Sequence, residues 1–347
     1  MTATPQEGTA PPAGGERARS RLLRLLGSAT ALVALGFVVF TLQTNLAALP
    51  PLSVSPTLLV CLVAGVAANV AVVLISAQAW RVLLRGAGHV LPLRQAFVLC
   101  GTAQIGKYLP GNVFHLVGRA TLAYQRASIS FDVSAASLAL ETALVLLAGT
   151  LVGAPFILTR SAAVLSLLGV SSLWLWAVVV IVAGMSGAFV FVLARPRVAA
   201  LLQRLRQMTT WRTVLQVLCW DIVTFVVLGT ALYLTAAVAW PDAFELSWME
   251  TTLAFTVAWV LGFVTPGAPG GIGVREAVFL LVLGGNSQSI AVGASLSVAS
   301  RLLSVCGDVV TFGLARLLDD GRKAEASKGD ASTTEGIGDQ GLVANNK

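Results

Sequence analysis

Apolar residues fall into long stretches separated by short polar segments, and this pattern predicts helices that cross a membrane. About 20 consecutive apolar residues form a helix long enough to cross the hydrocarbon core of a bilayer. Six stretches reach this length, at residues 25–48, 56–80, 133–157, 171–194, 213–239 and 288–317. We therefore predict an all-α fold, a polytopic transmembrane helix bundle with about six full spans.

Two further apolar regions, residues 95–127 and 249–285, are each interrupted by a Pro-Gly pair, at 110–111 and 266–267. Lipid offers no hydrogen-bond partners to the backbone groups that such a break exposes, so protein or a water-filled cavity must supply them. We predict that both regions are re-entrant broken hairpins. The alternative is that each region makes two tilted crossings.

The composition supports a membrane protein and excludes a soluble globular one. The chain is 56% hydrophobic and 11% charged, with a mean hydropathy of +0.83, whereas soluble domains carry about 25% charged residues. Its four cysteines stand singly in apolar stretches. Because they lack the paired spacing of a disulfide framework or a zinc site, we expect neither.

Basic residues lie on one side of the predicted spans. With the N terminus inside, four inner segments collect nearly all of them, whereas the outer loops between full spans carry only Arg160. The positive-inside rule then predicts a multi-pass protein of the plasma (inner) membrane with both termini cytoplasmic. The net charge of +7 follows this distribution, so we expect no nucleic-acid partner.

This topology brings the first hairpin into the membrane from the cytoplasmic side and the second from the outer side. Aligned on their breaks, LPGNVFHLVGR (109–119) and TPGAPGGIGVR (265–275) share Pro, Gly and Arg at matched offsets. Transporters with inverted repeats place their binding sites at discontinuous helices of this kind. We predict an inverted repeat with one central site between the two breaks.

The two ends of the chain differ from the apolar part. Residues 1–24 are basic and rich in Ala, Pro, Gly and Thr, and residues 319–347 are polar, small and of mixed charge. Both segments have too few apolar residues to fold alone. We predict disordered cytoplasmic ends on either side of one transmembrane domain at residues 25–318.

Eight charged residues lie within the apolar regions. At about 2.5 to 3.5 kcal/mol each, exposing them to lipid would cost on the order of 20 kcal/mol, so they must pair or line a wet cavity. One alternative is a static pair of Glu141 or Asp221 with Arg301, and another is that Lys107 and Arg119 extend to the inner interface. The eight residues are Lys107, Arg119, Glu141, Asp221, Arg275, Glu276, Arg301 and Asp308.

The breaks favour an anion site. A new half-helix is expected to start after each break, with free N–H groups and a positive dipole end that attract anions. Glycine lets the backbone approach a ligand closely, although these glycines would also serve a tight turn alone. We predict that the anion is held by Lys107, Gly111, Arg119, Gly270, Gly271, Gly273 and Arg275. The other intramembrane charges, Glu141, Asp221, Glu276, Arg301 and Asp308, are predicted to form a network of exchanging pairs, with Arg301 and Asp308 two turns apart on one helix face.

We find no pattern of an autonomous enzyme in the sequence. His89 and His115 are far apart, and no Ser or Cys has an evident base partner. His115 can line the predicted cavity, although a buried structural histidine is the favoured interpretation. The start of a dinucleotide fingerprint at Gly271 lacks its third glycine and its strand. We expect no catalytic residue, no metal and no cofactor.

Two stretches, GKYLPGNVFHLVGR (106–119) and TPGAPGGIGVREA (265–277), resemble signatures of the transmembrane region of lysylphosphatidylglycerol synthases, a flippase-like membrane family. The resemblance covers roughly residues 25–318. It implies handling of a phospholipid or a polyprenyl lipid, with Gly270, Gly271, Gly273 and Glu276 at the site. In full-length synthases a soluble aminoacyl-transferase domain follows, whereas only a short tail follows residue 318 here. Lipid aminoacylation by this chain alone is therefore not expected.

The sequence thus predicts a protein that binds an anionic lipid, a phospholipid or a polyprenyl-phosphate-linked one, and moves it between leaflets. A second hypothesis is a non-catalytic membrane subunit that presents a lipid to a separate glycosyl- or aminoacyl-transferase partner. A third is a membrane-embedded transferase with Glu276 or Glu141 as its acid-base residue.

Overall fold

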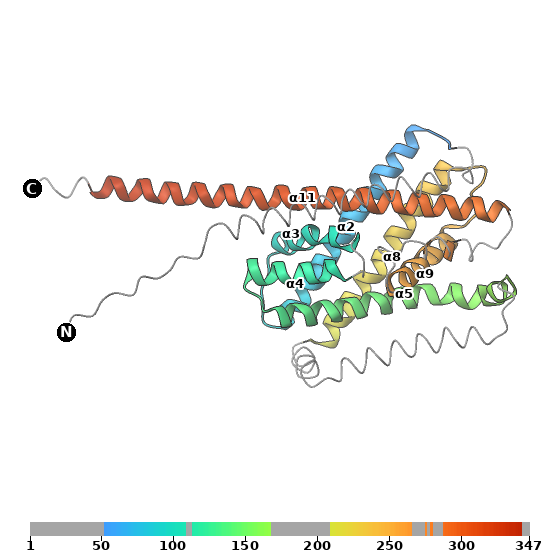
Figure 1. Ribbon diagram of the computed structural model, residues 1–347, viewed down its shortest axis with the longest axis horizontal. Coiled ribbons are helices and arrows are strands. Elements are labelled where there is room, and N and C mark those ends of the chain that lie inside the picture. Colours follow the sequence, from blue (N-terminus) through green and yellow to red (C-terminus); the bar gives the residue numbers. More distant parts are fainter. Residues whose placement is uncertain are drawn as a thin grey trace, which may run out of the picture.

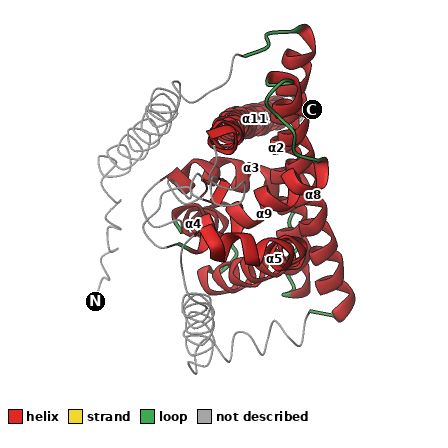
Figure 2. Ribbon diagram, turned by 90° about the vertical axis from the view of Figure 1, so that its right-hand side faces the viewer, coloured by secondary structure: helices red, strands yellow, loops and turns green. Residues whose placement is uncertain are grey.

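The structure is a computed structural model that describes residues 52–108, 113–167, 209–265, 275, 278, 279 and 287–341. Within these residues the fold is all-helical, with no strand (Figure 2). The helices are α2 (Pro56–Gly86), α3 (Leu93–Gln104), the 3₁₀ helix η2 (Ile105–Tyr108), α4 (Phe114–Ala127), α5 (Phe131–Leu167), α8 (Trp211–Ala239), α9 (Trp248–Val264) and α11 (Ser287–Gly341).

Four of these helices are long and apolar enough to cross a membrane: Pro56–Gly86, Phe131–Phe156, Trp211–Ala239 and Val292–Asp319. They confirm four of the six predicted spans as helices of sufficient length. The predicted spans at 25–48 and 171–194 lie outside the described residues. The backbone of α11 continues as helix to Gly341, into the segment whose composition predicts disorder. The predicted domain boundaries stay predictions.

The helices of the two interrupted regions are short. α3 has 12 residues and α4 has 14, which gives lengths of about 18 and 21 Å, less than the roughly 30 Å of a bilayer core. α9 ends at Val264, immediately before the second Pro-Gly pair, and Arg275 is helical again. The breaks themselves, at 109–112 and 266–274, lie outside the described residues.

α3 and α4 lie between the long helices α11 and α5 (Figure 1). α11 contacts α3, α3 contacts α4, and α4 contacts α5, so these four helices form one layer. α2 and α8 cross this layer and pack against each other, and α9 packs on α5 and α8. This arrangement surrounds the first interrupted region with helices on several sides.

Small residues allow the long helices to approach closely, as is usual in membranes. A Cβ atom added to Gly307 of α11 would lie 2.3 Å from Asn69 Cβ of α2. One added to Gly229 of α8 would lie 2.6 Å from Thr252 Cγ2 of α9. The largest apolar core, around Phe225, Leu232 and Phe279, fills the space between the long helices.

Local signals define where the spans begin. The Ser55 hydroxyl accepts a hydrogen bond from Leu58 N at 3.2 Å, and Pro56 occupies the first turn of α2, where its missing N–H costs nothing. α9 begins with a capping box between Ser247 and Glu250. By contrast, the N terminus of α4 at Val113 has no side-chain cap.

Candidate functional site

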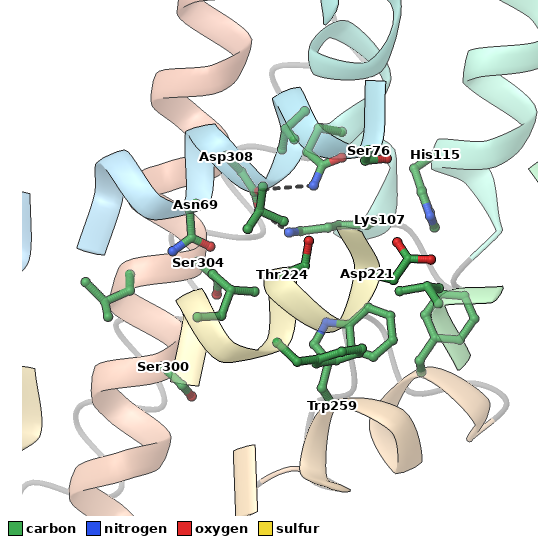
Figure 3. A pocket seen from close by; sticks show the side chains of 18 of the residues that line it. Asn69, Ser76, Lys107, His115, Asp221, Thr224, Trp259, Ser300, Ser304 and Asp308 are labelled. Atoms are coloured by element: carbon green, nitrogen blue, oxygen red, sulfur yellow. Dashed lines mark hydrogen bonds and ion pairs between the residues drawn. The ribbon is translucent and has the colours of Figure 1, made fainter. Parts of the chain in front are cut away.

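A cavity of about 210 Å³ lies among the helices, at the break of the first interrupted region. Its wall comes from α2, α3, η2, α4, α5, α8, α9 and α11, and from Arg275. Figure 3 shows polar side chains from several helices around one space. Seven of the eight intramembrane charges named from the sequence line it: Lys107, Arg119, Glu141, Asp221, Arg275, Arg301 and Asp308.

Arg119 of α4 and Glu141 of α5 form a buried ion pair. Arg119 Nη2 donates to Glu141 Oε2 at 3.0 Å. The Ser76 hydroxyl donates to the other carboxylate oxygen at 2.6 Å. The Arg119 guanidinium also lies over the Trp80 ring, 4.7 Å from its centroid, and the indole N–H of Trp80 donates to Ser137 at 2.9 Å. Neighbours on α2 and α5 therefore hold this pair in place.

This geometry corrects two sequence-based alternatives. Arg119 is only 5% exposed, so the hypothesis that it extends to the inner interface is wrong. Glu141 pairs with Arg119 and not with Arg301, because α4 packs on α5 and brings the two charges together. Asp221 forms no hydrogen bond or ion pair with any described residue, so it does not pair with Arg301 either.

Lys107 and Asp308 form a second ion pair on the cavity wall (Figure 3). Lys107 Nζ lies 2.5 Å from Asp308 Oδ2. The Tyr108 hydroxyl donates to the same oxygen, and Gln104 Nε2 donates to Oδ1 at 3.2 Å. The Lys107 side chain is 25% exposed and that of Asp308 is 4% exposed. The pair thus links η2 to the long helix α11.

Asp221 of α8 is the isolated carboxylate of the cavity. It is 5% exposed, and its Oδ2 has no hydrogen-bond partner among the described residues. Nδ1 of His115, which also lines the cavity, lacks a partner there too. Two ion pairs are thus defined among the described residues, Arg119–Glu141 and Lys107–Asp308, and Asp221 lies apart from both. The network of exchanging pairs stays a prediction.

Arg301 and Asp308 both face the cavity, which confirms that they share one face of their helix. They are 4% and 3% exposed. Together with Lys107, Arg119 and Arg275, Arg301 makes four cationic side chains on the cavity wall, against three carboxylates. Cations are thus in excess among the described lining residues. A desolvated cavity of this sign favours a negatively charged ligand.

Five of the predicted site residues lie outside the described residues. These are Gly111, Gly270, Gly271, Gly273 and Glu276. The structure therefore brings together Lys107, Arg119 and Arg275 of the predicted anion site, and the roles of the glycines and of Glu276 stay predictions.

Most of the uncharged polar residues of the wall were not predicted from the sequence. Several of them share a simple signal, because they lie within about one helical turn of a predicted charge along the chain. Thr224 follows Asp221 by three residues, and Ser300 and Ser304 flank Arg301. Residues three or four apart share a helix face, so this spacing would have found them. The uncharged polar wall residues that were not predicted are Asn69, Ser76, Gln104, Tyr108, Thr142, Thr224, Trp259, Ser300 and Ser304.

The polar wall is rich in hydrogen-bond donors. Among the described residues no group of three or more His, Cys, Asp or Glu side chains could hold a metal ion. Arginine, lysine, hydroxyl and amide groups dominate the polar wall, and these are donors to phosphate and carboxylate oxygens. The wall also carries apolar side chains such as Phe255 and Phe263.

Comparison with known protein families identifies a match over most of the chain. The family model described as the lysylphosphatidylglycerol synthase TM region matches residues 22–310. This range contains both interrupted regions and every charged residue of the cavity wall. No curated protein matches the chain.

Proposed function

Because the chain belongs to the family of lysylphosphatidylglycerol synthase transmembrane regions, we propose that it binds the headgroup of an anionic membrane lipid in this cavity and moves the lipid between leaflets. The observation that carries the proposal is the gathering of four cationic side chains, against three carboxylates, among the described residues that line a cavity between apolar helices. The lipid is a phospholipid or a polyprenyl-phosphate-linked lipid. Both carry a phosphate, and the phosphate is the group that the cavity is proposed to bind. The activity forms and breaks no covalent bond.

In this proposal Arg275 and Arg301 contact the headgroup. Both line the cavity, Arg301 from α11 and Arg275 from the segment after the second Pro-Gly pair. Guanidinium groups match two phosphate oxygens at once, which orients the headgroup as well as attracting it. Arg119 adds a further positive charge to the wall, where Glu141 and Trp80 position its guanidinium.

The two interrupted regions are proposed to be re-entrant hairpins of an inverted repeat, in a plasma membrane protein with both termini cytoplasmic. Short helices at the cavity support this reading, since α3 and α4 are too short to cross alone. In such proteins, access alternates when one repeat moves against the other around a fixed central site. The Lys107–Asp308 pair joins the first hairpin to α11 and must then adjust as access changes.

Translocation in reconstituted vesicles tests this function. Fluorescently labelled phosphatidylglycerol is incorporated in both leaflets, and a membrane-impermeant quencher reports the fraction that reaches the outer leaflet. The wild-type protein should let the quencher remove nearly all fluorescence, whereas protein-free vesicles should keep about half. Arg275→Ala should return the signal to that of protein-free vesicles while eluting as a folded protein.

Arg212→Ala is the matched control, because Arg212 is an exposed arginine of α8 whose contact is the ring of its neighbour Trp211. It should translocate like the wild-type protein. Unchanged translocation by Arg275→Ala would contradict the site. Binding of lipid without any translocation by the wild-type protein would favour a subunit that presents lipid to a separate transferase.

A further inference from the structure

The carboxylate of Asp308 is surrounded by three donors that come from one short segment of the chain. Lys107 Nζ and the Tyr108 hydroxyl each lie 2.5 Å from Oδ2, and Gln104 Nε2 lies 3.2 Å from Oδ1. Figure 3 shows the Lys107 and Asp308 side chains pointing toward one another. We call Gln104, Lys107 and Tyr108 the donor cradle.

The local backbone explains why these donors point one way. α3 ends at Gln104, and the chain tightens into the 3₁₀ helix η2 before the break. Such tighter turns are frequent at the C-terminal ends of α-helices. At Gly106 an added Cβ atom would lie 2.9 Å from His115 N, so the backbones of η2 and α4 approach each other too closely for any side chain. The cradle is thus built on the break and is fixed against α4.

The cradle combines an ammonium, a hydroxyl and an amide N–H, and it contains no acidic residue of its own. A phosphodiester carries one negative charge and two free oxygens, and a carboxylate presents the same charge on two oxygens. Charge-assisted hydrogen bonds of this kind serve either anion. All three donors and Asp308 line the cavity, so a headgroup there can reach the same donors.

The two ion pairs of the cavity differ in how firmly they are held. Arg119 is fixed by the Trp80 ring and by a carboxylate that also accepts from Ser76. The Lys107 side chain is 25% exposed, so it has room to shift toward a ligand. A buried carboxylate needs hydrogen bonds to its remaining lone pairs beside its counter-ion, and Tyr108 and Gln104 supply them for Asp308. All three donors line the cavity, so another anion that replaces the carboxylate meets the same hydrogen-bond donors.

We propose that the donor cradle is a phosphate subsite for the lipid headgroup, and that Asp308 occupies it until the headgroup phosphate displaces the carboxylate. This inference rests on the proposed function and names the residues that recognise the phosphate. Asp308 acts as an internal competitor. Its release on binding removes the ion pair and the hydrogen bond that Lys107 and Tyr108 of η2 make with α11.

Binding of short-chain phosphatidylglycerol to the full-length protein in detergent tests the proposal, with thermophoresis as the readout. Asp308→Asn removes the competing charge with little change of shape. We expect this variant to bind the lipid about tenfold more tightly than the wild-type protein, because the phosphate no longer has to displace a charged carboxylate. Asp308→Glu keeps the charge and should show no gain. Adding Lys107→Gln to Asp308→Asn should abolish the gain.

Asp319→Asn is the matched control. Asp319 lies on the same helix and pairs with Arg126 at 3.0 Å outside the cavity, so its neutralisation changes the same charge without touching the cradle. Its affinity should equal that of the wild-type protein. Soluble glycerol 3-phosphate is run in parallel. A gain with both ligands, or with the lipid alone, supports the subsite and tells whether acyl chains are needed.

Equal or weaker lipid binding by Asp308→Asn, with wild-type binding intact, would overturn the cradle and leave the proposed function standing. Binding by neither protein would overturn both. If Asp308→Asn does not fold, lipid binding by the single variant Lys107→Gln tests the proposal. This substitution should weaken lipid binding, and unchanged affinity would overturn the proposal.

Discussion

Removing the carboxylate of Glu141 should destabilise the protein more than any surface substitution. Arg119 is 5% exposed and would be left buried without its counter-charge, and Ser76 would lose the acceptor that lies 2.6 Å from its hydroxyl. Removing one partner of a buried ion pair costs about 3 to 5 kcal/mol. The Trp80 ring stays under the guanidinium in the variant, but it already contributes in the wild-type protein and cannot offset the loss.

The assay is equilibrium unfolding of Glu141→Ala in mixed micelles of rising SDS fraction, followed by circular dichroism. The free energy of unfolding should fall by about 3 to 5 kcal/mol. Arg126→Ala is the control, because it breaks an ion pair of the same 3.0 Å length whose arginine is 34% exposed. Such a pair contributes about 0 to 1 kcal/mol.

The double variant Arg119→Met with Glu141→Leu removes both charges at once. It should be closer to the wild-type protein than Glu141→Ala is, because no uncompensated charge remains in the core. A loss below about 1 kcal/mol for Glu141→Ala, or one no larger than that of Arg126→Ala, would refute the view that this pair is desolvated.

Three further stability predictions follow from single contacts, each measured as the free energy of unfolding in the same SDS titration. Gly307→Ala should destabilise by roughly 1 to 3 kcal/mol, because its Cβ atom would lie 2.3 Å from Asn69 Cβ. Gly313→Ala on the same helix, where nothing lies within 4 Å, should cause no loss. Trp80→Phe should cost about 1 kcal/mol, since it removes the 2.9 Å hydrogen bond to Ser137; an unchanged value would mean that water replaces the donor. Ser247→Ala should cost about 1 kcal/mol through the capping box of α9, and unchanged hydrogen exchange in the first turn of α9 would contradict this.

Hydropathy predicted the long helices well because lipid imposes a minimum length on any span. The predicted start at residue 56 coincides with the start of α2, since Ser55 caps the helix and Pro56 fits its first turn. α2 continues to Gly86, six residues beyond the predicted end. Its last turns carry Arg81 and Arg85, which lower the hydropathy without breaking the helix.

The sequence predicted which charged residues line the cavity, but it did not predict which of them form ion pairs. A charge in an apolar region must find protein or water, which is why listing such charges already selected seven residues of the cavity wall. Their partners depend on which helices pack together. Arg119 meets Glu141 because α4 packs on α5, and Asp308 meets Lys107 from 201 positions further along the chain. Sequence spacing carries no information on such contacts.

The identity of the lipid that stays with the purified protein tests the central claim most directly. The protein is extracted in a mild detergent, and native mass spectrometry identifies the lipids that remain bound. We predict an anionic, phosphate-containing lipid, enriched over its share of the membrane in the wild-type protein and in Arg212→Ala, and lost from Arg275→Ala. Retained lipids that match the bulk membrane composition, or that survive unchanged in Arg275→Ala, would contradict an anion-binding cavity.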